Sequence, residues 1–482
     1  MHMRCLAIVL GLLLGLAFAP TPAAADAPTR SATKKDESLV LVERVDIAGN
    51  VSTATRLVKR AIAIKEGTWV RIDDPRFRQI RYKVLALGYF RTVNVKLAKG
   101  SKRGHIIVKV AVKERGTIVL NHLLFGTSRA TPWWAGIDLS ERNFIGSGIS
   151  VGGGFVYAAE GPINNATNQY AFGLHIGDPS ILGSRYGAHG RFLYTDASEP
   201  FRIAGELSDG APDNFDSFSY TRTGAVAGMS MILTTLSQLT IDARVERVRA
   251  TTPDLPVRMR PDGTNEAIDL HLQPGVSRVV TMALGFERDT RADPVLPYNG
   301  NKVAVLGEVG ARWLGGDYDF ATLLAKYQHW WPLRSGSIRH VLSLHLTGGL
   351  ILGDAPRFDR LHVADLNRLI TPRALGLVVS TAATPNVFNT NADKTTYGEV
   401  GGAFEVQYTY RLFRSRKHVY GGDLFFGLGL WALGNRDDVR ARDRSLPRSI
   451  PVDLLIDAGL RLDTEIGIFE LTFANALGRI PL

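Results

Sequence analysis

The sequence predicts a mainly β protein: a transmembrane antiparallel β-barrel of about 16 strands, preceded by one small α+β domain. Three observations support this prediction. From about residue 116 to the C-terminus, short segments alternate apolar and polar residues and are separated by turn residues. A secretory signal begins the chain, and the alternating segments are too numerous for a soluble sandwich. Residues 38–115, which lie between the signal and the alternating segments, differ from those segments in both charge and pattern.

The alternation assigns two faces to each predicted strand, because successive side chains of a strand point to opposite faces. In residues 239–246, Leu239 and Ile241 share one parity, whereas Asp242 and Arg244 share the other. A charge that faces lipid at mid-depth costs about 2–4 kcal/mol, so the charged parity is expected to face a water-filled lumen. The residues placed there are Asp242, Arg244, Glu405, Arg461 and Glu470.

Tryptophans lie at or near the ends of several predicted strands, where an aromatic girdle would meet the membrane surface. They are Trp133, Trp134, Trp330, Trp331 and Trp431.

Fifteen segments show the strand pattern. Closed antiparallel bacterial barrels usually have an even number of strands. Either a strand is missed between Asp196 and Pro274, or the closing strand is short or absent. The segments are Thr117–Phe125, Trp134–Ser140, Ile149–Tyr157, Tyr170–Gly177, Gly187–Tyr194, Phe218–Met231, Leu239–Arg247, Arg278–Glu287, Val303–Trp313, Ala321–Trp331, Val341–Ile351, Gly398–Arg411, Tyr420–Leu433, Val452–Asp463 and Phe469–Leu477.

The N-terminus predicts export. Arg4 precedes an apolar run, Leu6–Phe18, and Ala23-Ala24-Ala25 follows as a small-residue cleavage site, so residues 1–25 are typical of a signal peptide. A membrane-spanning first helix is less favoured because the run is short. Cys5 is expected to leave with the signal, which excludes disulfides and thiol chemistry from the mature chain. Residues 26–37 are expected to form a polar linker.

The positive charge is concentrated in residues 38–115, which hold 18 Lys and Arg against 6 Asp and Glu, whereas residues 116–482 hold 35 against 37. This difference predicts two domains, residues 38–115 and residues 116–482. The charge suits anionic lipid head groups, an acidic partner or plain solubility. Nucleic acid is a poor candidate partner in an exported protein.

The small domain is predicted to run strand-helix-helix-strand-strand, with Ser52 or Thr53 capping the first helix and Asp73-Asp74-Pro75 starting the second. Two helices on one face of a three-stranded sheet leave a sheet edge that can accept an extended segment of another chain. The alternative is a packing module whose edge is blocked by lysines. The candidate client edge is formed by Val93, Val95 and Leu97.

This stretch resembles a POTRA domain. The resemblance rests on Val45-Asp46-Ile47-Ala48-Gly49-Asn50 at the first strand, and on Leu87-Gly88-Tyr89-Phe90 followed by Val93-Asn94-Val95 after the second helix. It covers the whole domain, and it implies a periplasmic module that handles unfolded clients.

Three barrel segments resemble the BamA/TamA family of outer-membrane assembly factors. The first is residues 136–148 (GIDLSERNFIGSG), which are similar to an early barrel hairpin of that family. The second resembles the family's mid-barrel turn, with Ala292-Asp293 where Asp-Asn is usual. The residues of this turn are Arg288, Asp289, Thr290, Arg291, Asp293 and Pro294, followed by Pro297 and Gly300.

The third segment, residues 358–376, occupies the place of the family's long sixth extracellular loop, which folds back into the barrel. The loop tip is degenerate, and Arg373 is aligned with the family's tip arginine. The resemblance implies lumen-facing acids as its partners: Glu405, and Asp457 in place of an acid replaced by Gly427. The alternative for Arg373 is a solvated loop arginine.

The resemblance implies an outer-membrane factor that inserts or translocates proteins in a Gram-negative bacterium. Its partners would be unfolded outer-membrane or secreted proteins, outer-membrane lipids and possible periplasmic accessory proteins. The alternative is a passive pore or receptor that retains the family fold, which the degenerate tip favours. No cofactor or enzymatic activity is expected, since the Gly148–Gly152 match to a hydrolase elbow opens an alternating strand rather than a strand-to-helix turn.

Overall fold

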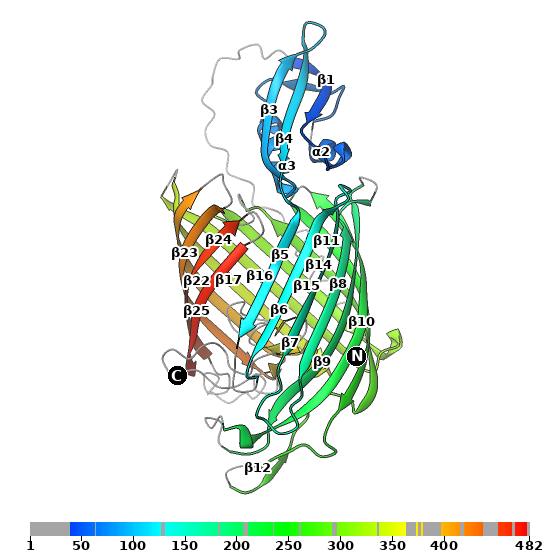
Figure 1. Cartoon of the computed structure of the whole chain (residues 1–482), viewed down its shortest axis with the longest axis vertical. Helices are drawn as coiled ribbons and strands as arrows, with labels where there is room; N and C mark the ends of the chain where they lie inside the picture. The colour runs from blue at the N-terminus through cyan, green and yellow to red at the C-terminus, as the bar shows by residue number, and fades with distance from the viewer. Residues whose placement is uncertain are drawn as a thin grey trace.

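The computed structural model shows a small α+β domain at one end of a large curved sheet (Figure 1). It describes residues 39–479, except for residues 63, 127–130, 182–183, 206–210, 235, 260–261, 292–295, 335–336, 363–372, 375–376, 379–396, 415–418, 437–451 and 465–467. The predicted signal peptide and linker, residues 1–37, lie outside the described residues.

The N-terminal domain has four strands rather than the predicted three, in the order β2-β1-β4-β3. The missed strand has three residues, which is too short to show an alternating pattern. The chain runs β1 (Leu39–Ala48), α2 (Thr55–Ala61), β2 (Trp69–Arg71), α3 (Pro75–Ala86), β3 (Phe90–Lys99) and β4 (His105–Glu114).

The two helices begin differently from each other. Asp74 caps α3 as predicted, since its side chain accepts a hydrogen bond of 2.8 Å from the backbone N–H of Arg76. The prediction that Ser52 or Thr53 caps α2 is wrong, because the N-cap position is Ala54 and no side chain caps the helix. The backbone N–H groups of Ser52 and Thr53 instead donate to the Glu114 carboxylate at the end of β4.

The described residues form the fifteen barrel strands counted in the sequence, one fewer than the expected total of about 16. They form one antiparallel sheet in the order β25-β24-β23-β22-β17-β16-β15-β14-β11-β10-β9-β8-β7-β6-β5. The strands are β5 (Ile118–Gly126), β6 (Trp134–Phe144), β7 (Ile149–Ala158), β8 (Gln169–Asp178), β9 (Tyr186–Arg202), β10 (Phe215–Thr234), β11 (Ser237–Thr251), β14 (Gly275–Asp289), β15 (Gly300–Gly310), β16 (Phe320–Arg334), β17 (Ser337–Gly353), β22 (Val400–Arg414), β23 (Val419–Gly434), β24 (Val452–Thr464) and β25 (Ile468–Arg479).

The suspected extra strand between Asp196 and Pro274 is not in the sheet. Within the described part of that region, β9 and β10 are longer than predicted, and a short hairpin of β12 (Val257–Met259) and β13 (Asn265–Ala267) stands apart. The predicted strand Val303–Trp313 ends earlier, because Arg312–Leu314 form the 3-10 helix η3.

The two strand faces follow the predicted parity. On β11, Ile241 and Val245 are exposed on the outer face, whereas Glu246 is 4% exposed on the inner face. The tryptophan girdle is only partly correct, because neighbouring residues of a strand face opposite ways. Trp133 and Trp331 are exposed, but Trp134, Trp330 and Trp431 are buried.

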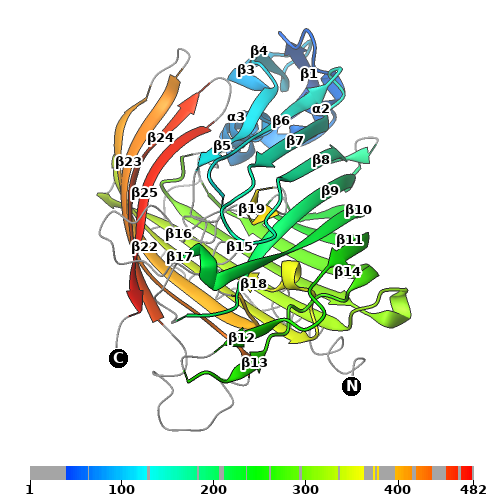
Figure 2. The ribbon, with the colours of Figure 1, turned by 60° about the horizontal axis from the view of Figure 1, so that its bottom comes forward.

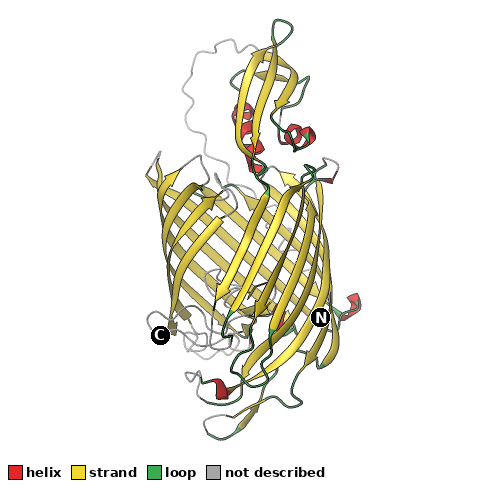
Figure 3. Cartoon of the chain, viewed as in Figure 1, coloured by secondary structure: helices red, strands yellow, loops and turns green. Residues whose placement is uncertain are grey.

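The turns at the two ends of the barrel differ in length. The end that carries the N-terminal domain has short turns, such as residues 145–148, whereas the far end carries the long connections (Figure 1). Seen from that far end, β18 (Leu361–His362) and β19 (Arg373–Ala374) lie inside the ring of strands (Figure 2). Among the described residues, the α-helices belong to the N-terminal domain, and the rest contains only short helical turns (Figure 3). Among the described residues, no helix has the length and apolar character needed to cross a membrane.

Replacing outward-facing Ile241 with lysine should lower the free energy of unfolding by about 2–4 kcal/mol in lipid vesicles, because the charge would enter the hydrocarbon. Urea unfolding followed by tryptophan fluorescence measures the change. The neighbouring Thr240→Lys variant, whose charge enters the lumen, is the control and should lose much less. Equal losses in both variants would contradict the assigned faces.

Candidate functional site

The barrel sheet has a seam between its first and last strands. β5 and β25 end the sheet order, and among the described residues no ladder joins them. Fifteen antiparallel strands leave β5 and β25 running in the same direction, so they could pair only as parallel strands. A parallel pair is slightly less stable per residue than an antiparallel pair. The seam is therefore the weakest line in the wall.

The N-terminal domain contacts the barrel on the β5 side of the seam through the β6–β7 turn. The backbone N–H of Ala54 donates to the Gly146 carbonyl at 2.9 Å, and Asn143 Nδ2 donates to Thr53 Oγ1 at 2.9 Å. Gly146 has a φ of 72°, and a Cβ there would collide with the Ser52 carbonyl. The close approach of the two domains therefore requires a glycine at this turn.

The same domain also reaches the other side of the seam. Arg91 on β3 and Arg115 after β4 both lie over the ring of Tyr420 on β23, at 5.9 and 5.1 Å from its centroid. Arg115 Nη2 donates to the Thr464 carbonyl at the end of β24, at 3.5 Å. These contacts bring the N-terminal domain to both sides of the seam at one end of the barrel.

At the far end, a short turn inside the barrel binds three neighbouring strands. This turn is η4 (Arg357–Asp359), and together with Arg360 we call it the lumen anchor. Arg357 Nε donates to Glu199 Oε2 on β9 at 2.9 Å. Glu199 is 1% exposed and also accepts from the hydroxyls of Tyr220 and Tyr397, at 2.5 and 2.7 Å. Three donors thus satisfy one buried carboxylate.

The next two residues of the lumen anchor face β10 and β11. Phe358 is buried, and Arg222 lies over its ring at 3.8 Å from the centroid. Asp359 accepts two hydrogen bonds from the Arg244 guanidinium, at 2.6 and 3.0 Å. A guanidinium that binds a carboxylate through two parallel bonds fixes the geometry as well as the charge.

The Arg244 side chain joins further strands to the lumen anchor. Its Nη2 lies 2.9 Å from Glu308 on β15, and Glu246 forms a buried pair with Arg222 at 2.8 Å.

Arg360 of the lumen anchor lies 3.5 Å from Glu399, just before β22. Glu399 also binds Arg436. The connection after β17 is therefore fixed within the barrel by charges from both walls.

A second inward-facing cluster contains two of the predicted site residues. Gln407 Nε2 donates to Glu405 at 3.3 Å and to Asp457 at 3.5 Å, and all three side chains are buried. Gly427 pairs with Asp457 in the β23–β24 ladder, and a Cβ at Gly427 would collide with the Asp457 carboxylate. The glycine therefore makes room for the acid on the next strand.

The structure does not bring Arg373 to this cluster by any described contact. The backbone of Arg373 pairs with Val378 in a short ladder of β19 and β20 (Leu377–Val378), and its side chain lies outside the described residues. The pairing of Arg373 with Glu405 and Asp457 stays a prediction. The side chain of Glu470 also lies outside the described residues.

The mid-barrel turn is held by local bonds. Asp289 accepts from the backbone and the guanidinium of Arg291, and Thr290 Oγ1 donates to the Asn301 carbonyl at 3.0 Å. Gly300 has a φ of 101°, and a Cβ there would collide with the Thr290 carbonyl. Arg288 is exposed, and Asp293 and Pro294 lie outside the described residues.

This turn also reaches other strands. The carbonyl of Leu296 accepts a bond of 2.8 Å from Arg411 on β22, which pairs with Asp423 on β23 at 3.0 Å. The turn therefore covers part of the barrel mouth nearest the N-terminal domain.

The predicted client edge lies at a true sheet edge, because β3 pairs only with β4 in the described part of the domain. Val93 is 2% exposed and belongs to the domain core, so it offers only its backbone to a partner. Val95 is partly buried and Leu97 is exposed on the same face. The edge is therefore more accessible toward the Leu97 end.

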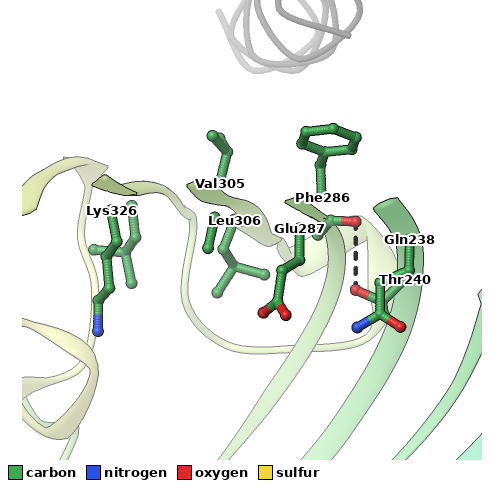
Figure 4. A pocket seen from close by; sticks show the side chains of 10 residues that line it. Gln238, Thr240, Phe286, Glu287, Val305, Leu306 and Lys326 are labelled. Atoms are coloured by element: carbon green, nitrogen blue, oxygen red, sulfur yellow. Dashed lines mark hydrogen bonds between the residues drawn. The ribbon is translucent and has the colours of Figure 1, made fainter. Parts of the chain in front are cut away.

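A cavity of about 310 Å³ opens on the inner wall of the barrel. Glu287, Leu306 and Lys326 point into it, whereas Phe286 and Val305 point away (Figure 4). Thr240 Oγ1 donates to the Gly285 carbonyl at its side, at 3.4 Å. The described residues contain no group of three or more His, Cys, Asp or Glu side chains that could bind a metal ion.

Sequence reasoning missed most of the lumen anchor. Residues 358–361 were identified only as the beginning of a loop, and Arg244 was placed in the lumen without a partner. The sequence signal that could have identified it is the run of charges in Arg357-Phe358-Asp359-Arg360, together with charged residues predicted to face the lumen. The partners of the lumen anchor could not be predicted from the sequence, since Arg357 and Glu199 are 158 residues apart.

The chain is similar to known outer-membrane proteins. Residues 143–365 match the Omp85 superfamily domain. The chain is 24% identical over 341 residues to the outer membrane protein assembly factor BamA of Nitratidesulfovibrio vulgaris strain Hildenborough. That alignment covers 68% of this chain and 37% of the relative, so the chain spans little more than a third of the relative's length.

Solved structures share the fold at low sequence identity. CdiB from Escherichia coli matches with a TM-score of 0.53 at 10% identity, covering 100% of this chain and 94% of that chain. CdiB from Acinetobacter baumannii matches with a TM-score of 0.54 at 9% identity, covering 91% and 74%. BamA from Haemophilus ducreyi lacking POTRA domains 1–3 matches with a TM-score of 0.50 at 12% identity, covering 92% and 82%.

Replacing Arg357 with alanine should lower the free energy of unfolding by about 3–5 kcal/mol, because it removes a charged partner of the buried Glu199 carboxylate. Urea unfolding in vesicles measures the loss. The control is Arg312→Ala, whose side chain is 68% exposed and lies 3.5 Å from Asp319, and it should lose no more than about 1 kcal/mol. A loss for Arg357→Ala no larger than that of the control would contradict the role of the lumen anchor.

The Glu114 bonds should make the N-terminal domain less stable in acid. Burial alone would raise the pKa of the Glu114 carboxyl, but the bonds from Ser52 and Thr53 outweigh it and hold the pKa below its ordinary value of 4.5. Their contribution is complete above that ordinary value and is lost as the pH falls through the lowered pKa. Thermal unfolding of the wild type and of Glu114→Gln should therefore differ at pH 7 and converge in acid, and a constant difference would contradict the assignment.

Proposed function

We propose that the chain is a BamA/TamA-type Omp85 protein that assembles or translocates proteins at the outer membrane. We infer that it lies in the outer membrane of a Gram-negative bacterium, as the name of the BamA relative suggests, with its N-terminal region in the periplasm. In the proposal, residues 38–115 act as a POTRA domain, which receives an unfolded client and passes it to the seam or the lumen.

The single observation that carries the proposal is the seam. Lipid cannot satisfy backbone N–H and C=O groups, so two sheet edges within a membrane are costly unless another strand covers them. β5 and β25 are such edges in the described sheet, and a client strand could pair with either of them. A closed barrel with every strand paired on both sides would offer no edge for a client strand.

The client would first add to the free edge of β3, near Leu97. Strand addition uses backbone bonds, which suits a domain that handles many sequences. β3 also carries Arg91, one of the residues that contact Tyr420 near the seam. The client edge and the seam are therefore connected through one strand of the N-terminal domain.

The work would come from client folding and from perturbation of the lipid around the seam, without covalent catalysis. Outer-membrane lipids and unfolded outer-membrane or secreted proteins are then the partners, and periplasmic accessory proteins are possible additional ones. The alternative of a passive pore is less favoured, because the lumen anchor fixes the connection after β17 across the interior by buried ion pairs.

Deleting residues 38–115 should abolish client processing while the barrel still inserts, because the client would lose its first binding site. The measurement is a census of outer-membrane proteins after depletion of the wild type and expression of the deleted form. The full-length Arg357→Ala variant, expressed in the same way, tests separately whether client processing needs the lumen anchor.

Unchanged outer-membrane protein levels after depletion would overturn the proposal. Steady ion conductance through the purified barrel, unaffected by the deletion, would instead support a passive pore.

A further inference from the structure

The β3–β4 hairpin carries positive charge and, except for Glu114 at its end, no acidic residue of its own. Residues 90–113 contain no Asp or Glu, and Glu114 at the end of β4 is bound to Ser52 and Thr53. The basic residues of the hairpin are Arg91, Lys96, Lys99, Lys102, Arg103, Lys109 and Lys113.

Two of these lysines face each other across the hairpin. Lys96 pairs directly with Lys109 in the β3–β4 ladder, and both side chains are exposed. Like charges directly opposite each other destabilise a sheet. Lys113 lies on the same face of the sheet, opposite Thr92. The hairpin thus maintains an unfavourable cluster of charge on the face away from the helices.

The acids on the neighbouring strand bind partners other than Lys96 and Lys109. Asp46 pairs with Lys109 in the β1–β4 ladder, but its carboxylate lies 3.0 Å from Arg44. Glu43 accepts bonds from the backbone and the hydroxyl of Ser101, at 2.7 and 2.9 Å. Among the described residues, neither Lys96 nor Lys109 forms an ion pair.

The charged face adjoins the free edge of β3. Side chains alternate along this strand, so Lys96 points to the open face while Val95 and Leu97 point toward the helices. A strand added to the edge would therefore meet lysine on one face and an apolar side chain on the other. Such a strand would itself need to alternate.

We infer that the β3 edge selects extended polypeptide segments whose alternate residues are acidic and apolar. The acidic side chains would lie beside Lys96, with Lys109 one strand farther in, and the apolar ones would lie beside Leu97. Lysines at a sheet edge also discourage pairing with strands that lack the complementary charge. The same residues thus admit one class of segment and reject others.

A polypeptide fits this surface better than a membrane does. β4 leads from the hairpin turn down to the barrel, and its ten residues span about 33 Å. The turn at residues 100–104 is therefore the part of the domain farthest from the barrel (Figure 1). The charged face runs along this direction, away from the membrane plane.

The test uses the full-length protein in neutral lipid vesicles and three labelled nine-residue peptides, in which leucine alternates with aspartate, serine or lysine. Fluorescence anisotropy measures binding. The aspartate peptide should bind about tenfold more tightly than the lysine peptide at low salt, and this preference should decrease as salt is added.

Lys96→Glu should remove or reverse the preference for the aspartate peptide. Lys65→Glu, which makes the same charge change at an exposed site away from the hairpin, is the control and should keep it. A backbone N-methylated aspartate peptide should bind weakly, because strand addition needs the amide donors. An equal effect of the two substitutions would overturn the inference.

The inference rests on the proposed strand addition, and the peptides separate the two. If the serine peptide binds as tightly as the aspartate peptide, strand addition stands and charge selection is wrong. If no peptide binds, the lysines only block the edge and strand addition itself fails. If anionic vesicles bind through Lys96 while the aspartate peptide does not, the surface is a lipid contact and the inference is overturned.

Discussion

Backbone hydrogen bonding in a medium without water is the constraint on which this structure depends. Within hydrocarbon, each strand must pair with its neighbours on both sides, so a sheet is stable there only if it closes. In the described sheet, fifteen antiparallel strands meet this requirement everywhere except between β5 and β25. Because these two strands run in the same direction, closure would need the weaker parallel pairing. Because the number of described strands is odd, the free-energy cost of unpaired or weakly paired backbone groups falls on the seam alone.

The N-terminal domain contacts the wall on both sides of this line, and interactions at the far end of the barrel hold strands farther from it. The N-terminal domain contacts the β6–β7 turn on one side and Tyr420 on the other. At the far end, the lumen anchor ties β9, β10 and β11 to the connection after β17. Buried ion pairs add little net stability but are costly to break. They therefore fix one arrangement of the lumen, while the membrane-embedded part of the seam has only its own strands to hold it.

The sequence predicted the strands well because the alternation is a local property, which each segment shows by itself. The inward position of Arg244 followed from the same pattern. Strand β2 was missed because three residues show no period. The partners of Arg357 could not be predicted, because closing the barrel brings together residues that are far apart in the chain. Trp134 and Trp330 were misplaced because an aromatic residue near a strand end can face either side, and only register decides.

The central claim is that a client strand pairs at the seam. A cysteine at Leu120 on β5, tested against single cysteines along the terminal strand of an unfolded barrel client, measures this pairing by disulfide formation during insertion into vesicles. Met229→Cys on β10, which is exposed on the outer face but paired on both sides, is the control. The account predicts cross-links in one register at Leu120 and few at Met229. Equal cross-linking at both positions, or none at Leu120 while clients still insert, would contradict it.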